Sequence, residues 1–302
     1  MPKPRFASKA LAVAQIAGLA VAAGALVAAV AIPAVGFAGM VTRNTANNFN
    51  TMATPELGQI PVRSELVDRH GKVLAYYYGR GIDRVPVSYA QISPVMRQAI
   101  VAIEDSRFYQ HGAIDFKGTV RAIVNNLEHN PVQGGSTLAQ QYVKNVLYLS
   151  SPNPQAAFAG ATSETIGRKI RELRMAARVE HQMSKNEILA SYLNVAYFGS
   201  SAYGIEVAAE RYYNTDASKL TLPQSALLAG LVENPTAYDP INNPKTALDR
   251  RNQVLQRMVQ VGDITQSAAD AAGRQPLGLN PTVLQKGCQS SERKQGAYSH
   301  PH

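Results

Sequence analysis

The longest apolar run of the chain lies at its N-terminus. Residues 10–42 contain no charged side chain, and three basic residues precede them, Lys3, Arg5 and Lys9. About 20 apolar residues are enough to cross a bilayer, and preceding basic residues favour a cytoplasmic N-terminus. A cleaved signal peptide is the alternative, but its apolar region is normally only about 7 to 15 residues long. We therefore predict a cytoplasmic tail over residues 1–9 and a single transmembrane anchor over 10–42, with the remainder outside the cytoplasm.

The next segment predicts a linker and a small β-hairpin. Residues 43–61 are polar and contain two prolines, which is typical of a juxtamembrane linker. The following residues alternate between apolar and polar around His70 and Gly71, as two short strands joined by a turn would do. We assign residues 43–84 to this linker and hairpin.

From Ser93 onward the pattern is helical and carries recognisable helix starts. Ser93 followed by Pro94 is typical of a helix N-terminus, and Ser184 with Glu187 forms a capping box. Further helices are expected to begin after Thr137 and Thr221 and to cover residues 164–180, 204–213, 246–261 and 265–273. These segments predict a mainly α body, one domain over residues 85–275.

Composition and charge narrow the function classes. The chain has 302 residues, 45% of them apolar, and a formal net charge of +9. This charge suits nucleic acid, an anionic membrane or a phosphorylated substrate. Neither a stacked-aromatic RNA motif nor zinc-ligand spacing occurs, so nucleic acid is not expected as a partner. The single cysteine, Cys288, has no second cysteine in the chain for a disulfide.

Three stretches could carry chemistry, although each also has an ordinary structural explanation. Residues 101–118 place Glu104 and Asp105 where an apolar helix ends; burial and the helix C-terminus would raise the pKa of Glu104, which suits a general base. The second stretch, 134–145, is a glycine-rich loop before a capped helix. In the third, 164–180, cations surround Glu172 and can hold a diphosphate, but an exposed helix with ordinary ion pairs has the same pattern.

Taken together and in order, these stretches resemble the family-51 peptidoglycan glycosyltransferases, the glycan-polymerising domain of class A penicillin-binding proteins. The first motif, E-D-x-x-F-x-x-H, is present as Glu104, Asp105, Phe108 and His111. The second, G-G-S-T-[IL]-x-Q-Q-x-x-K-N, is complete over residues 134–145. The third begins with Arg168, Lys169 and Glu172 and continues through Asn194 to Phe198 and Gly199. Ala113 departs from the glycine that the family usually has there.

The resemblance implies a lysozyme-like domain that polymerises lipid II into β-1,4-linked glycan with inversion and release of polyprenyl diphosphate. Glu104 would be the general base, and Glu172 the second catalytic carboxylate. Substrate and diphosphate binding is implied for Lys144, Arg168, Lys169, Ser136, Thr137, Gln140 and Asn194. Asp105, Phe108 and His111 would shape the loop.

The resemblance also implies which cofactors and partners to expect. No cofactor is required, and no metal site is predicted from residue spacing; a divalent cation, Mg²⁺ or Mn²⁺, is an option at the diphosphate. The expected partners are lipid II, the growing glycan strand, the membrane and other cell-wall synthesis proteins.

The C-terminal residues predict no second activity. Ser291 and Lys294 match the S-x-x-K pattern of transpeptidases, but the S-x-N and K-T-G motifs do not follow. We expect residues 276–302 to be a truncated, disordered connector. Two alternatives to the polymerase stay open: a lytic transglycosylase or muramidase, which would not need the cations around Glu172, and an inactive remnant that acts as an envelope scaffold.

Overall fold

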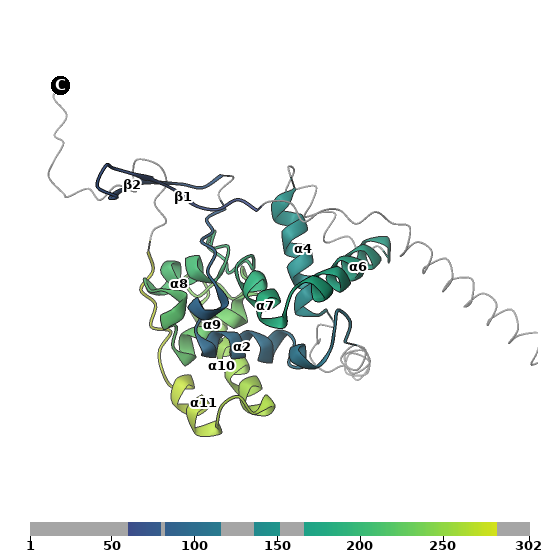
Figure 1. The fold of residues 1–302 in the computed structure, drawn as a ribbon. Coiled ribbons are helices and arrows are strands. Elements are labelled where there is room, and N and C mark those ends of the chain that lie inside the picture. Colours follow the sequence, from purple (N-terminus) through teal and green to yellow (C-terminus); the bar gives the residue numbers. More distant parts are fainter. Residues whose placement is uncertain (1–59, 80–81, 116–135, 152–165, 283–302) are drawn as a thin grey trace, which may run out of the picture. The chain divides into compact units, whose positions relative to one another are not determined.

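A computed structural model describes residues 60–79, 82–115, 136–151 and 166–282 (Figure 1). The chain divides into two compact units, residues 1–53 and 54–302, and all described residues belong to the second. Within the described part, none of the helices combines the length and the apolar character that a bilayer crossing requires. The predicted tail, the predicted anchor, Cys288 and the S-x-x-K match lie outside the described residues.

The predicted hairpin is present. Strand β1 (Ser64–Val67) pairs antiparallel with β2 (Val73–Tyr77), with a register irregularity between Leu66 and Val67. The turn is held by Asp68, whose Oδ1 accepts hydrogen bonds from two backbone N–H groups, those of His70 and Lys72. Gly71 lies in this turn with a φ of +79°, a conformation that glycine adopts without steric cost.

The rest of the described chain is mainly helical, which confirms the mainly α prediction. The α-helices are α2 (Pro94–Glu104), α4 (Leu138–Ser150), α6 (Ile166–Gln182), α7 (Lys185–Leu193), α8 (Ile205–Tyr213), α9 (Leu222–Leu231), α10 (Pro244–Val261) and α11 (Gln266–Gly273). Three short 3₁₀ turns, which the sequence pattern did not predict, are η2 (Tyr89–Gln91), η3 (Phe108–Gln110) and η4 (Ala217–Lys219).

The predicted helix starts are at the expected positions, but one cap differs. Ser184 and Glu187 form the capping box of α7, and Thr137 caps α4 by accepting from the N–H of Gln140. The hydroxyl of Ser93, by contrast, makes no cap hydrogen bond; it donates to the carbonyl of Leu220 at 2.9 Å. Pro94 alone therefore marks the start of α2, and Ser93 ties this start to the segment before α9.

Helix α9 forms the centre of the core. It is apolar on all sides, and its residues from Ser225 to Leu231 are buried, as expected for a helix enclosed by others. Helices α2, α10 and α11 pack against it, while α4 packs against α6 and α7 (Figure 1). This packing places the end of α2 close to α4 and α7, as the hydrogen bonds described below show.

Candidate active site

Glu104 is the last residue of α2, and its carboxyl faces α4 and α7. Gln141 of α4 donates from Nε2 to Glu104 Oε2 at 2.7 Å. The hydroxyl of Tyr192, in α7, donates in turn to Gln141 Oε1 at 3.2 Å. Burial is the largest influence on Glu104 and raises the pKa of its carboxyl, while the hydrogen bond from Gln141 opposes that rise. The predicted raised pKa of Glu104 is therefore confirmed in direction.

Charged side chains from three further places act on Glu104. Lys144 of α4 and Arg250 of α10 lower the pKa of this carboxyl, and Glu233, which follows α9, raises it. Arg250 and Glu233 form an ion pair at 2.8 Å, and Arg250 also donates from Nε to the carbonyl of Gly230 at 3.3 Å. These influences are smaller than burial, so Glu104 takes up a proton more readily than an exposed glutamate.

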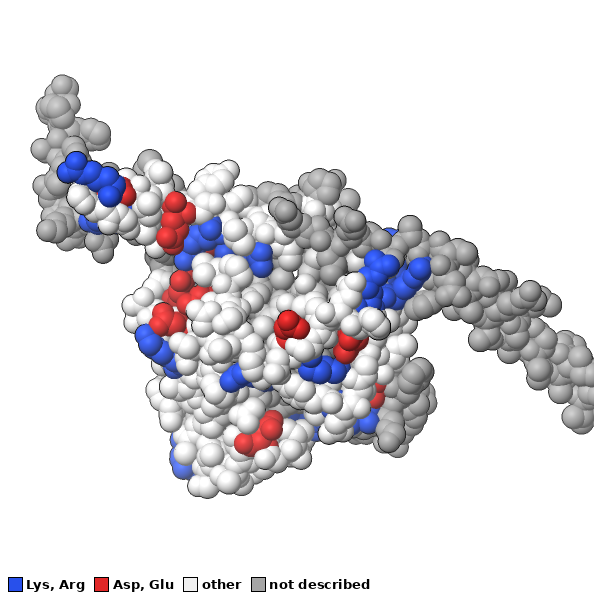
Figure 2. All heavy atoms as spheres, in the orientation of Figure 1, with Lys and Arg blue, Asp and Glu red and all other residues white. Residues whose placement is uncertain are grey.

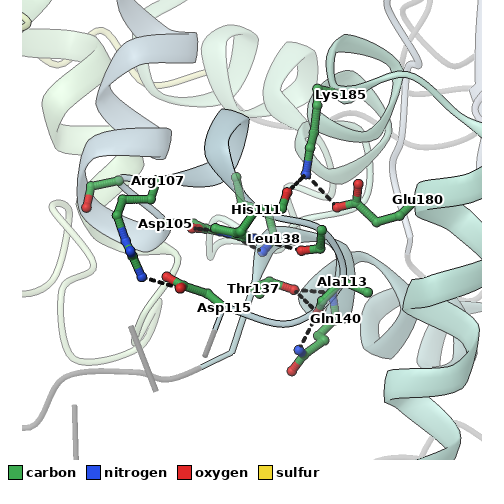
Figure 3. A network of polar contacts seen from close by, with 12 residues as sticks. Asp105, Arg107, His111, Ala113, Asp115, Thr137, Leu138, Gln140, Glu180 and Lys185 are labelled. Atoms are coloured by element: carbon green, nitrogen blue, oxygen red, sulfur yellow. Dashed lines mark hydrogen bonds and ion pairs between the residues drawn. The ribbon is translucent and has the colours of Figure 1, made fainter. Parts of the chain in front are cut away.

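Asp105, the next residue, has a different environment (Figure 3). Its Oδ1 lies 2.7 Å from Nε2 of His111, and its Oδ2 accepts from the backbone N–H of Leu138 at 3.1 Å. The other ring nitrogen of His111 lies 2.6 Å from the carbonyl oxygen of Gly112. Asp105 thus joins the end of α2 to the 105–115 loop and to the first turn of α4.

Phe108 and Lys185 also hold the same loop. Phe108 is fully buried, and the ammonium of Lys185 lies 4.5 Å from the centre of its ring. Lys185 also donates to the carbonyl of His111 at 2.6 Å and to Glu180 Oε1 at 2.8 Å (Figure 3). A cation–π contact and a charge-assisted hydrogen bond therefore fix the loop onto α6 and α7.

A second polar group lies where α4 begins and α6 passes it. The Nζ of Lys169 lies 3.0 Å from Ser136 Oγ and 3.0 Å from Gln140 Oε1. The side chains of Gln140 and Thr137 both donate to the carbonyl of Ala113, at 2.8 and 3.1 Å. The structure thus brings together four of the residues predicted to bind the substrate and diphosphate: Ser136, Thr137, Gln140 and Lys169.

The remaining predicted residues of this group are placed as follows. Glu172 is buried in α6, with only 4% of its surface exposed, and Lys144 is exposed on α4. Arg168 is the third residue of α6, but its side chain is outside the described residues. Helix α6 carries five lysines and arginines, and the largest group of blue atoms in Figure 2 lies over it. The α6 side of the site is therefore cationic.

Asn194 does not join this group. Its side-chain amide donates to the carbonyl of Val87 at 2.8 Å and accepts from the N–H of Val87 at 2.9 Å. Both of its polar groups are thus used to hold the segment before η2 onto the end of α7. These contacts give Asn194 a structural role. Within the described part of the chain, its side chain makes no hydrogen bond to the other predicted binding residues.

One cluster of possible metal ligands occurs in the described part of the chain. Ligand atoms of Asp105, His111 and Asp115 lie within 4.8 Å of one another. Each of them already has a partner, because Asp105 contacts His111 and Leu138 while Asp115 pairs with Arg107. We interpret the cluster as part of the hydrogen-bonded loop and assign no metal to it.

Sequence reasoning missed four side chains around Glu104: Gln141, Arg250 and Glu233, which act on its carboxyl, and Tyr192, which contacts Gln141. Gln141 was recognised only as a letter of the second motif, and Tyr192 and Arg250 were given no role at the site. Gln141 and Tyr192 are 51 positions apart, and only the packing of α4 on α7 brings them together. One signal in the sequence could have indicated that Gln141 lies at the site: it is the second glutamine of the Gln140–Gln141 pair and lies one helical turn before Lys144.

Comparisons with known proteins show the family to which the chain belongs. The family model described as Transglycosylase matches residues 70–259. A Cupriavidus necator protein named as a transglycosylase is 40% identical over 197 residues, covering 65% of this chain and 79% of that protein. Penicillin-binding protein 1A/1B of Bacillus subtilis is 37% identical over 255 residues, covering 84% of this chain and 26% of that protein.

Two further relatives show how the lengths compare. Penicillin-binding protein 1A of Escherichia coli is 37% identical over 223 residues, covering 74% of this chain and 24% of that protein. The crystal structure of penicillin-binding protein 1A from Haemophilus influenzae covers 76% of this chain and 22% of its own, with 22% identity and a TM-score of 0.40. The chain thus spans about a quarter of the length of the penicillin-binding proteins that it matches.

Proposed function

This chain belongs to the transglycosylase family of peptidoglycan glycosyltransferases, and we propose that it polymerises lipid II into β-1,4-linked glycan strands. The observation that carries the proposal is Glu104, a partly buried carboxyl with a raised pKa at the end of α2. Its partner Gln141 lies on α4, and Lys169, a cation of α6, contacts Gln140 on the same helix. A base and a separate cationic site are what a transfer from a diphosphate donor needs.

In the proposed reaction Glu104 acts as general base. Its carboxylate takes the proton from the 4-hydroxyl of the acceptor GlcNAc as that oxygen attacks the anomeric carbon of the donor MurNAc. The new bond joins C1 to the acceptor oxygen, and the bond from C1 to the diphosphate oxygen breaks. The electron pair leaves with the polyprenyl diphosphate, and attack from the opposite face inverts the configuration at C1.

The α6 side would stabilise the leaving group. Lys169, which contacts Ser136 and Gln140, supplies a cation beside two polar side chains. Lys144 and Arg168 add positive charge from α4 and α6, and charge-assisted hydrogen bonds to phosphate oxygens are among the stronger ones in proteins. Glu172 could share a divalent cation, Mg²⁺ or Mn²⁺, with the diphosphate, since such ions are commonly held by one or two carboxylates together with substrate phosphates.

The substrate sets the proposed location of the protein. Lipid II carries a polyprenyl tail that stays in the bilayer, so the enzyme has to work at the membrane surface. We propose that residues 10–42 anchor the chain in the cell membrane and that the catalytic domain lies outside the cytoplasm. The charge of residues 1–9 and the apolar character of residues 10–42 support this arrangement.

Polymer formation from lipid II by the purified full chain tests the proposal. The unmodified chain should make glycan polymer, and Glu104→Gln should lower the rate about 10²- to 10⁴-fold, the usual contribution of a general base. Glu187→Gln is the matched control, because glutamine also completes a capping box and Glu187 is exposed at the start of α7. Normal polymer formation by Glu104→Gln would remove Glu104 from the mechanism.

One observation also favours a second candidate, a lytic enzyme of the muramidase type. A carboxyl with a raised pKa can donate a proton to a glycosidic oxygen as well as accept one. Such an enzyme would release soluble fragments from isolated cell wall and make no polymer from lipid II. If neither reaction occurs and Glu104→Gln leaves the cellular phenotype unchanged, the scaffold alternative is the better account.

A further inference from the structure

We propose that Tyr192 and Gln141 are a positioning pair for Glu104, in which Tyr192 fixes the Gln141 amide so that its N–H faces the carboxylate. This inference rests on the proposed role of Glu104 as the base. It adds one residue that contacts the base, Gln141, and one that orients this contact, Tyr192; neither takes a proton from the substrate. The three side chains come from α2, α4 and α7, so the pair also couples the base to the packing of these helices.

The argument begins with the donors and acceptors of the three groups. An amide side chain has one acceptor end and one donor end, and an ionised carboxylate only accepts. With Glu104 ionised, Gln141 has to turn its Nε2 toward Oε2 of Glu104, as it does at 2.7 Å. Its Oε1 then points away and needs a donor, which the hydroxyl of Tyr192 supplies at 3.2 Å.

Tyr192 is suited to remain a donor. It is fully buried, and burial, with a smaller contribution from Glu104, raises the pKa of its phenol well above the ordinary value. The hydroxyl therefore keeps its proton throughout the working pH range. If Tyr192 did not donate, Gln141 Oε1 would be left without a donor. Leaving a buried polar group unpaired costs free energy. The tyrosine and the glutamine thus hold each other in one orientation.

The two carboxylate oxygens of Glu104 therefore have different roles. Oε2 is occupied by Gln141, whereas no hydrogen bond from a described residue reaches Oε1. Oε1 is thus the atom left to receive a proton from the acceptor hydroxyl. The N–H of Gln141 also stabilises the ionised form against burial, so the base stays ionised at a lower pH than burial alone would allow.

Other charges near Glu104 act in addition to the pair. Among the described residues these are Lys144 of α4, Arg250 of α10 and Glu233 after α9. None of the three is a hydrogen-bond partner of Glu104, and all remain in place when Tyr192 or Gln141 is replaced. A change in the pH dependence of such variants therefore reports on the pair.

The test uses Tyr192→Phe in the full chain, with Tyr213→Phe as the matched control. Tyr213 is also buried, but its hydroxyl has no hydrogen-bond partner among the described residues. Lipid II polymerisation is measured against pH for each variant. For Tyr192→Phe we expect the acidic limb to move to higher pH and the rate below the limb to fall roughly five- to tenfold, the effect of one hydrogen bond. Tyr213→Phe should keep the unmodified limb.

Gln141→Leu provides a second, independent variant, since Gln141 is only half-buried and its loss disturbs the core less. Its acidic limb should move in the same direction and further. An unchanged limb in both variants, or an equal loss of rate at every pH, would overturn the positioning role. If the unmodified chain makes no polymer, the proposed function fails; the carboxyl titration of Glu104 by difference infrared spectroscopy then still tests the pair, which predicts a higher pKa in both variants.

Discussion

The two adjacent carboxylates at the end of α2, Glu104 and Asp105, differ in the hydrogen-bond partners of their oxygens. Asp105 has a partner on each oxygen: the ring of His111 on one and the backbone N–H of Leu138 on the other. Glu104 has one partner, Gln141, and its second oxygen receives no hydrogen bond from a described residue. Among the described residues, the Asp105 region is a loop anchor with a partner on each oxygen, whereas the Glu104 carboxyl is held through one oxygen.

This difference separates a structural carboxylate from a reactive one. Two donors stabilise the charge of a buried carboxylate and fix its position, but they also occupy the atoms that a base would use. A base needs one oxygen for orientation and one for the proton. The residue types alone do not distinguish the two cases, because Glu104 and Asp105 carry the same functional group and follow each other in the sequence.

Replacing Asp105 should have the largest effect, a decrease in the stability of the protein. Asp105→Ala would leave the N–H of Leu138 buried without its acceptor and release His111 from the end of α2. We expect the free energy of unfolding to fall by about 1.5 to 3 kcal/mol, as for loss of hydrogen bonds to a charged group. Urea unfolding followed by circular dichroism measures it. A loss no larger than that of Glu104→Gln at the same pH would contradict the assignment of the two roles.

A smaller effect concerns the pH dependence of stability at Glu104. Its pKa is raised in the folded protein above the ordinary value of 4.5. The protonated form is therefore favoured by folding, and this contribution is complete below pH 4.5 and is lost as the pH rises through the folded pKa. Glu104→Gln removes the titration, so its stability relative to the unmodified chain should increase over that pH range. A constant difference between the two unfolding curves would show that burial does not act on Glu104.

Local chemistry explains why much of the fold could be predicted. The capping box at Ser184 and Glu187, the cap at Thr137 and the proline at position 94 each fixed a helix start within a few residues. The hairpin followed from alternation around a turn that contains Gly71. All of these signals lie within a few positions of the structure that they specify, so a single sequence contains them in full.

The parts of the site that escaped prediction depend on contacts between distant positions. Asn194 matches the motif and was expected to bind substrate, yet its amide pairs with Val87, which lies 107 positions earlier. Tyr192 lies within the third motif, which assigns it no role, and only its contact with Gln141 gives it a polar role. Lys169, of the third motif, lies beside Ser136 and Gln140 of the second, but the motifs did not say which of the two glutamines faces Glu104.

The most direct test of the central claim is a titration of the Glu104 carboxyl itself. Carbon-13 NMR of the full chain with labelled glutamate, assigned by the signal that disappears in Glu104→Gln, gives the pKa of this group. We predict a value above 4.5 that coincides with the acidic limb of lipid II polymerisation. A pKa at or below the ordinary value, or an acidic limb that does not follow it, would contradict the account of Glu104 as the base.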